Sequence, residues 1–514
     1  MRSAASKLHG DSGLTKTSRS ETVPEIGPRR HSNKSLAALV VVLAAFFLLQ
    51  FLLPLRTAIQ IGADEGFELA KATLCLKGYQ LYTEVWNDQP PLHTFLTTQI
   101  LKRLSPSILG PRLVTSVFTV VLLIAIFFLC LRISGLLVAA LTTALLIASP
   151  GFIELSSSCM LEIPALAPAV AALCLLLRRN RSNWLIAEIL SGILFGLAFQ
   201  IKLINVILIP LAILIIWLQH RASAVPARNI STALLVLAAS LAVSFVASDL
   251  LIDGGSFLRH FQQSWSSHFA AAKSFEYGSP NDHPFDWSVP LKNWDTTIPA
   301  ILGIIFSLQQ IRKTPTAVLP ITWLALSLLV LGSHKPWWPY YYIHNVIPLC
   351  WCAAIGVRAA CQWIRLRRNV GWYLLVGVFG ICAAAWMGAR VYLQVASIRS
   401  SPQTYSSLVL QQIERLKPFA KFIYTEEPIY SFHAGIPMPP QLAVVPLKRL
   451  WSGDMTNARI GAEMAQVKPE IILLRSTTTD TPFNDLLAAE YRPIYEDGEH
   501  RLYARKSVAK QAGY

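Results

Sequence analysis

Acidic residues gather within residues 62–112, a polar segment between two apolar runs, and their types suit proton-transfer chemistry. Asp64 and Glu65 are neighbours, so on a helix their side chains would point about 100° apart and would not share a proton. We therefore expect one to face a site and the other to serve structure. An ionised Asp, whose ordinary pKa is about 3.9, can act as a general base toward an attacking hydroxyl. Solvation of the loop is the alternative role, and it is favoured for Glu68 and Glu84.

Two charged residues at the ends of later apolar runs could complete such a site. Glu162 begins a run ahead of Pro164, and Lys202 follows another run. Each has a structural alternative, because a carboxylate in a helix's first turn suits the helix dipole and a lysine at a helix end can extend its ammonium group to the interface. His334 and Lys335 precede an aromatic group that a membrane interface would also favour. That group comprises Trp337, Trp338, Tyr340, Tyr341 and Tyr342.

Candidate metal ligands are sparse in this sequence. His268 and His283 lie near Asp282 and Asp286 in a second polar segment, and Asp88 is a further weak candidate. Their spacing matches no recognised ligand set, so the sequence allows a divalent metal without requiring one, and no other cofactor is expected. The cysteines lie mainly in apolar runs, with no CxxC pattern and no disulfide framework.

The composition bounds the fold class. Hydrophobic residues make up 53% of the 514 residues and charged residues only 14%, and the apolar residues form long unbroken runs. A helix rises about 1.5 Å per residue, so about 20 residues cross a hydrocarbon core. The sequence therefore predicts a polytopic α-helical membrane protein with about eleven spans. The expected spans are residues 35–53, 113–131, 135–150, 162–177, 185–200, 203–219, 229–251, 297–311, 316–333, 342–362 and 371–393.

The basic residues indicate an orientation for these spans. The Lys and Arg residues behind the net charge of +16 lie mainly in short links, and the links after even-numbered spans contain no Asp or Glu. Since cytoplasmic links are enriched in Lys and Arg, we expect a cytoplasmic N-terminus and outer loops at residues 54–112 and 252–296. This distribution argues against nucleic acid as a partner. The expected location is a bacterial inner (plasma) membrane, with the active site and the C-terminus facing outside.

The sequence divides into three regions. Residues 1–34 are polar and are predicted to be a disordered cytoplasmic tail. Residues 35–393 form the predicted membrane domain. Residues 394–514 have the composition of a soluble protein and predict a small external α/β domain. Its expected strands are Phe422–Tyr424, Ile471–Leu474 and Leu502–Ala504, with helices around Leu408–Leu416 and Ile460–Gln466.

Several motifs follow one another in an informative order. Asp-Glu comes after the first apolar run, WNDQPPLHTF contains a Pro-Pro-Leu turn, and Gly-Pro-Arg opens the second run. SSSCMLEIPALAP and GLAFQIKLINVILIP continue the series, and SHKPWWPYYYIHNVIPL echoes it. The arrangement resembles the GT-C glycosyltransferases of family 39, which include the protein O-mannosyltransferases and the lipid A aminoarabinose transferases. The resemblance covers most of the membrane half and little of the C-terminal region.

The resemblance implies a GT-C fold and transfer of a sugar, with inversion, from a polyprenyl-phosphate donor to an acceptor hydroxyl at the outer membrane face. The acceptor could be a protein, a lipid or a glycan. Asp64 is then the base, and Glu65 and Glu162 complete the catalytic group. The residues expected to contact the donor phosphate and its lipid are Lys202, Lys335, His334, Arg112, Asp88, Gln89 and Tyr341.

Two positions depart from the pattern of this family. Asp88 and Gln89 stand where many relatives carry Glu-Lys, which removes a phosphate contact, and Glu162 replaces a more usual Asp. The alternative function is a multi-span transporter or flippase for a lipid-linked or anionic substrate. That function favours ionisable residues near mid-membrane and an internal repeat, whereas Glu188 and Lys202 lie near span ends and no repeat is evident.

Overall fold

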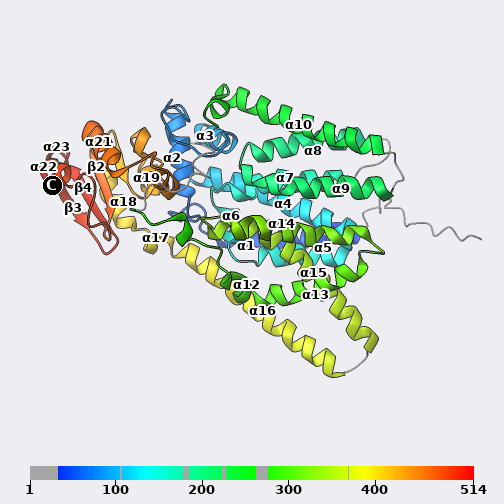
Figure 1. The fold of residues 1–514 in the computed structure, drawn as a ribbon. Coiled ribbons are helices and arrows are strands. Elements are labelled where there is room, and N and C mark those ends of the chain that lie inside the picture. Colours follow the sequence, from blue (N-terminus) through cyan, green and yellow to red (C-terminus); the bar gives the residue numbers. More distant parts are fainter. Residues whose placement is uncertain (1–32, 105–106, 178–183, 223–226, 262–275, 368–369) are drawn as a thin grey trace, which may run out of the picture. The chain divides into compact units, whose positions relative to one another are not determined.

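Long helices running side by side form most of the structure (Figure 1). A computed structural model describes residues 33–514 apart from 105–106, 178–183, 223–226, 262–275 and 368–369. The predicted tail at residues 1–34 lies almost wholly outside the described residues. The long helices are α1 (Asn33–Leu52), α4 (Leu109–Ser134), α5 (Leu136–Ile147), α7 (Glu162–Leu176), α8 (Trp184–Phe199), α9 (Ile209–Ala222), α10 (Ala227–Asp253), α13 (Trp294–Gln310), α14 (Leu319–Ser333), α15 (Ile343–Arg367) and α16 (Val370–Arg399). Three 3₁₀ segments extend α9, α14 and α15 at their N-termini: η1 (Leu203–Leu208), η3 (Pro315–Val318) and η4 (Pro339–Tyr342).

The apolar runs form the helices that the sequence predicts. Within the described residues, seven helical segments are long and apolar enough to cross a membrane, by length and composition, and three shorter apolar helices accompany them. The polytopic helical fold is thereby confirmed. The predicted span at residues 297–311 corresponds to α13, which runs alongside the others in Figure 1 but is not among these apolar helices. The expected number of eleven spans is thus one more than the apolar helices found in the described part of the chain.

Small residues let α13 and α15 approach closely. A Cβ atom on Gly303 would collide with the Cys352 carbonyl, and one on Gly356 would collide with the Pro299 carbonyl. Without side chains at these two positions, the backbones can touch, which is a common basis of helix association in membranes. This contact explains how α13 packs in the helical layer.

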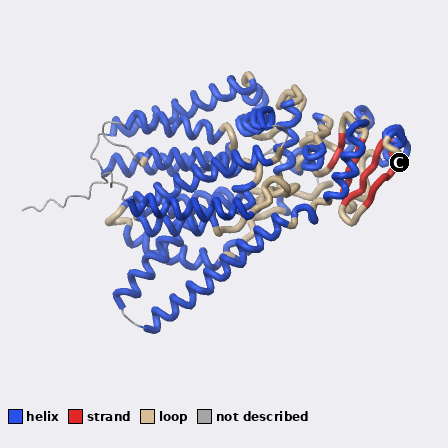
Figure 2. Tube along the Cα trace, turned by 180° about the vertical axis from the view of Figure 1, so that it is seen from behind, coloured by secondary structure: helices blue, strands red, loops and turns tan. Residues whose placement is uncertain are grey.

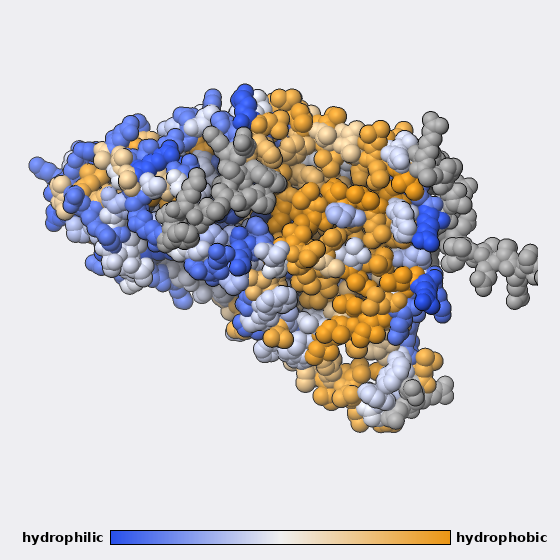
Figure 3. Space-filling model, viewed as in Figure 1, coloured by the Kyte–Doolittle hydropathy of each residue, from blue (hydrophilic) through white to orange (hydrophobic). Residues whose placement is uncertain are grey.

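Burial differs between central and outer helices. α7 is buried on nearly every side, including Ile163, Leu166 and Val170, as expected for a helix that is apolar all round. By contrast, α10 and α16 expose apolar side chains such as Leu251 and Leu374. Figure 3 shows this hydrophobic surface over the helices, with hydrophilic residues at the C-terminal region and at the opposite helix ends. Such a surface suits contact with lipid tails.

The C-terminal region forms a small mixed sheet at one end of the helices (Figure 2). The strand order is β1 (Ile423–Thr425), β2 (Ile471–Arg475), β4 (His500–Arg505) and β3 (Tyr491–Glu496), with β1 and β2 parallel and the other pairs antiparallel. The three predicted strands are present, and β3 is additional. The helices are α17 (Ser401–Thr404), α18 (Ser407–Leu416), α19 (Pro428–Ala434), α20 (Leu447–Trp451), α21 (Asn457–Val467), α22 (Asn484–Glu490) and α23 (Lys506–Gln511).

Short helices at the same end of the bundle connect the long ones: α2 (Glu65–Leu76), α3 (Leu92–Leu104), α6 (Phe152–Ser157) and α12 (Ser288–Lys292). α2 shares a hydrophobic core with the C-terminal region, because Leu69 and Ala72 pack in one cluster with Ile429 and Tyr430 of α19. α16 also continues to Arg399, beyond the predicted domain boundary at residue 393. The C-terminal region is therefore packed on the segment that carries the candidate site.

Candidate functional site

A fully buried ion pair lies beside Asp64. Arg112, in the first turn of α4, donates through Nε to Glu65 Oε1 at 2.9 Å and through Nη2 to Glu65 Oε2 at 2.7 Å. Its Nη1 donates to the carbonyl oxygens of Leu55 and Ala58 at 2.7 and 2.9 Å. The planar guanidinium thus joins α2 to α4 through the bidentate pair with Glu65. Its bonds to the two carbonyls join the segment after α1 to α4 as well.

Backbone groups occupy the remaining positions around the Glu65 carboxylate. The Ile61 N–H donates to Oε2 and the Cys159 N–H to Oε1, each at 2.9 Å. Burial alone would raise the pKa of Glu65, but the Arg112 guanidinium and these backbone donors hold it below its usual range. This geometry favours a positioning role for Glu65 over the catalytic role expected from the sequence. It likewise favours a structural role for Arg112 over a phosphate contact.

Asp64 stands at the N-cap of α2, where its side chain makes no capping hydrogen bond. The residue is half-buried, and the Tyr340 hydroxyl donates a hydrogen bond to its carboxylate. Burial and the nearby Glu162 carboxylate raise the pKa of Asp64 above its usual value, against the opposing effect of Lys202. A raised pKa makes a carboxylate a better proton acceptor, which suits a general base.

Lys202 and Glu162 form a buried ion pair, brought together from the segment after α8 and the first turn of α7. The Lys202 ammonium lies 5.1 Å from the ring centroid of Tyr340 and 5.2 Å from that of Tyr341. Burial alone would lower the pKa of Lys202, but Glu162 raises it, so the ammonium stays charged. Among the described residues, Glu162 Oε2 has no hydrogen-bond partner. Because an ammonium has three N–H donors, the pair retains both donors and an acceptor for a ligand.

A second buried network supports the WNDQPP segment. Lys71 Nζ donates to Glu68 Oε1 at 2.6 Å and to Asn87 Oδ1 at 3.0 Å. Asn87 Nδ2 and the Tyr82 hydroxyl both donate to the Gln89 carbonyl, at 2.9 and 2.7 Å. Glu68 is only 4% exposed, so the solvated role favoured for it from the sequence is wrong. The network fixes the backbone of the turn that carries Asp88 and Gln89.

The C-terminal region contributes a residue that sequence reasoning missed. Lys448 Nζ of α20 lies 3.8 Å from Asp88 Oδ2. Burial, then Lys448, then Lys202 lower the pKa of His334, so both ammonium groups act on this imidazole. The His334 ring centroid is 5.9 Å from that of Tyr341. The sequence did not predict that Lys448 lies near Asp88, because the two residues are far apart in the chain and no local pattern links them.

Glu154 of α6 is a further carboxylate whose part in this cluster the sequence did not indicate. Burial raises the pKa of Glu154 to about 7, assisted by the carboxylates of Glu162, Glu65 and Asp64 and opposed by a hydrogen bond from the Ala63 N–H. Glu154 lies on a short helix after α5, and no sequence pattern there predicts that it belongs to this group of carboxylates. The structure therefore gathers more acidic groups around Asp64 than the motifs alone suggested.

The other predicted residues lie apart from this cluster or outside the described residues. Lys335 is exposed, in contrast to the buried Lys202. His268 lies outside the described residues. His283 packs between aromatic rings, 4.9 Å from Trp338 and 5.8 Å from Trp451. In the described residues there is no group of three or more His, Cys, Asp or Glu side chains that could hold a metal ion.

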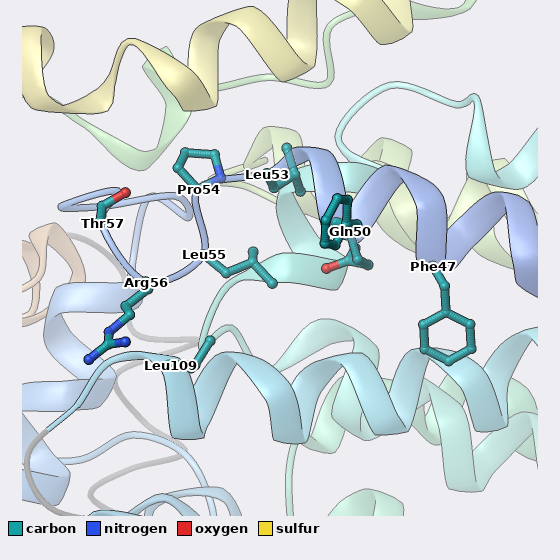
Figure 4. A pocket seen from close by; sticks show the side chains of 9 residues that line it. Phe47, Gln50, Leu53, Pro54, Leu55, Arg56, Thr57 and Leu109 are labelled. Carbon is teal, nitrogen blue, oxygen red and sulfur yellow. The ribbon is translucent and has the colours of Figure 1, made fainter.

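A pocket of about 540 Å³ lies at the end of α1 (Figure 4). Its lining is mainly apolar, with Arg56 and Thr57 on the adjoining loop. None of the predicted site residues lines it. The Leu55 carbonyl, however, accepts from Arg112, so the pocket wall is joined to the buried ion pair.

The fold is similar to those of two solved proteins. ArnT from Cupriavidus metallidurans, solved bound to undecaprenyl phosphate, matches 92% of this chain and 99% of its own, with a TM-score of 0.62 and 12% identity. The oligosaccharyltransferase AglB from Archaeoglobus fulgidus matches 87% of this chain and 70% of its own, with a TM-score of 0.55 and 10% identity. These matches show a shared fold.

A family model matches part of the sequence. Residues 81–263 match the sequence model of the dolichyl-phosphate-mannose-protein mannosyltransferases. The matched range includes Arg112, Glu162 and Lys202. No curated protein matches the chain. The resemblance drawn from the motifs is confirmed.

Proposed function

We propose that the enzyme transfers a sugar, with inversion at the anomeric carbon, from a polyprenyl phosphate to an acceptor hydroxyl, and that Asp64 is the general base. The observation that carries the proposal is the half-buried Asp64 carboxylate, hydrogen-bonded to Tyr340 and held beside the Lys202–Glu162 pair. The acceptor O–H gives its proton to Asp64 as its oxygen bonds to the anomeric carbon. The bond from that carbon to the phosphate oxygen breaks on the opposite side, and the phosphate leaves with the electron pair.

Lys202 is the residue that supports the leaving group in this proposal. Negative charge grows on the phosphate as the glycosidic bond breaks, and a fixed positive charge in a dry site stabilises that charge most. The Lys202 ammonium is buried beside the rings of two tyrosines, which help to keep water away from it. Glu162 orients the ammonium and offers its unpartnered Oε2 to a hydroxyl of the substrate.

Replacing Lys202 with Ala is therefore expected to lower kcat/KM for the lipid-linked donor at least about tenfold, which corresponds to about 1.4 kcal/mol of transition-state binding. Acceptor affinity should change little. Steady-state kinetics of the purified enzyme in nanodiscs measure both constants, and thermal unfolding confirms that each variant is folded.

The controls separate charge from packing. Lys335→Ala, at an exposed position, should lower donor kcat/KM less, and Lys313→Ala, exposed at a link between spans, should leave it unchanged. Lys202→Gln keeps most of the side-chain length without the charge, and it should behave like the Ala variant. If donor kcat/KM were unchanged in both Lys202 variants, Lys202 would have only a structural role at a helix end.

The orientation of the site is also part of the proposal. The basic links place the N-terminus in the cytoplasm and the Asp64 segment and the C-terminus outside. We expect reporters fused after Arg228 and after Arg368 to report a cytoplasmic location, and a reporter at the C-terminus to report an external one. A cytoplasmic C-terminus would contradict the proposed orientation and the role of α13 as a span.

A transfer assay tests the proposed reaction directly. The purified chain in nanodiscs is given polyprenyl-phosphate sugars with three acceptor classes: a hydroxyl-bearing peptide, a lipid-linked glycan and a soluble glycan. Transfer to at least one hydroxyl, with inversion seen in the anomeric NMR signal of the product, supports the proposal. Retention of configuration, or attachment to nitrogen, would overturn it.

A further inference from the structure

We propose that Lys448, carried by the C-terminal region beside Asp88, is a second fixed cation of the donor-phosphate site. This inference rests on the proposed function and deepens it. The C-terminal region would then take part in donor binding rather than only covering the helices.

The position of Lys448 is built by its neighbours. Arg449, the next residue, is buried and donates from Nη1 to the carbonyls of Gln441 and Val444, at 2.9 and 3.0 Å. Its guanidinium also lies 5.6 Å from the ring centroid of Trp86, in the outer segment that leads to Asp88. These Arg449 contacts hold α20 against the WNDQPP segment. Lys448 is therefore carried by α20, whose position these Arg449 contacts fix.

Charge and burial around Lys448 point to the same site. Its side chain is 13% exposed and that of Asp88 15%, so neither is a freely solvated surface charge. The segment that carries Asp88 also lies against the segment that carries Lys202, because the Leu92 N–H donates to the Gln200 carbonyl at 3.1 Å. Since Lys202 in turn pairs with Glu162 and acts on Asp64, Lys448 extends a single charged cluster.

The charge balance of that cluster calls for a further cation. Asp64, Glu162 and Asp88 are carboxyl groups, whereas Lys202 is a single ammonium and Gln89 is neutral. A polyprenyl phosphate that gains negative charge on leaving would be repelled by such a site. Lys448 reduces the repulsion, because like charges brought together in a poorly solvated site are strongly unfavourable.

The test measures binding of polyprenyl monophosphate to the full-length protein in nanodiscs by native mass spectrometry. Lys448→Ala should raise Kd at least about tenfold, as expected for loss of one charge-assisted contact, and Lys448→Arg should restore most of the affinity. Asp88→Asn should lower Kd, because it removes a negative charge beside the phosphate. Lys510→Ala, exposed on α23, is the matched control and should leave Kd unchanged.

The opposite signs expected for the two partners distinguish phosphate binding from a structural role. If the Lys448–Asp88 pair only held α20 in place, breaking it from either side would weaken binding and lower the unfolding temperature alike. That result, or equal Kd values for the parent and Lys448→Ala proteins, would overturn the inference while leaving the proposed function intact. If the parent protein did not bind polyprenyl monophosphate, the proposed donor site would be wrong, and so would the inference that depends on it.

Discussion

Replacing Asp64 with Asn is expected to reduce sugar transfer by about 100-fold or more while leaving the protein folded, because the amide keeps the size of the side chain but cannot accept the proton. Asp64 makes no capping bond to α2, so the helix does not depend on its charge. The measurement is single-turnover transfer from a polyprenyl-phosphate sugar by purified protein, with thermal unfolding as the check on folding.

The control for this variant is Glu84→Gln, which makes the same chemical change at an exposed position of the same segment and should leave the rate unchanged. The pH profile gives a second readout. Because the base must be ionised, kcat/KM should fall as the pH drops through the pKa of Asp64, which burial and Glu162 hold above the usual value for Asp. Near-parental transfer by Asp64→Asn would show that another group accepts the proton.

Breaking the Arg112–Glu65 pair should have the largest effect on stability. Removing one partner of a buried ion pair leaves an uncompensated charge and typically lowers the free energy of unfolding by about 3–5 kcal/mol. Arg112→Ala should therefore give little folded protein, with a much lower unfolding temperature in detergent. Arg112→Lys should recover only part of the loss, since an ammonium cannot form the bidentate pair and reach both backbone carbonyls.

Arg103→Ala is the matched control for Arg112, because Arg103 is exposed near the end of α3. It should unfold at the parental temperature. If Arg112→Ala were as stable as this control yet inactive, Arg112 would act on the substrate instead, as the sequence pattern first suggested. The two roles thus differ in which measurement changes, the unfolding temperature or the rate.

The sequence predicts the helices well because each one is encoded locally. An apolar run of sufficient length has to satisfy its backbone hydrogen bonds within itself when it lies in lipid, so α1, α4 and α10 follow directly from composition. α13 shows the limit of this reasoning. It owes its place to the contact of Gly303 and Gly356 with neighbouring backbones, which no single run encodes.

The candidate site could be predicted only in part, for a related reason. Asp64, Glu162 and Lys202 were found through motif order, and the structure brings them together. The adjacency of Asp64 and Glu65 indicated that one of them serves structure, but the partners that give Glu65 this role, Arg112 and the Cys159 backbone, are distant in sequence and were not predicted. Lys448 belongs to the C-terminal region, where the family resemblance adds little, and only tertiary packing reveals it.

The packing of α2 against α19 has a consequence for how the enzyme is made. Gly66, two residues after Asp64, has no room for a side chain because the Ile429 backbone lies against it. During synthesis the Asp64 turn is made early, and its packing partner emerges only after all the long helices have been translated. Nascent or truncated chains that lack α19 would leave the apolar side of α2 uncovered. The packing around the Asp64 turn is therefore completed only when α19 has reached the same side of the membrane as the first loop.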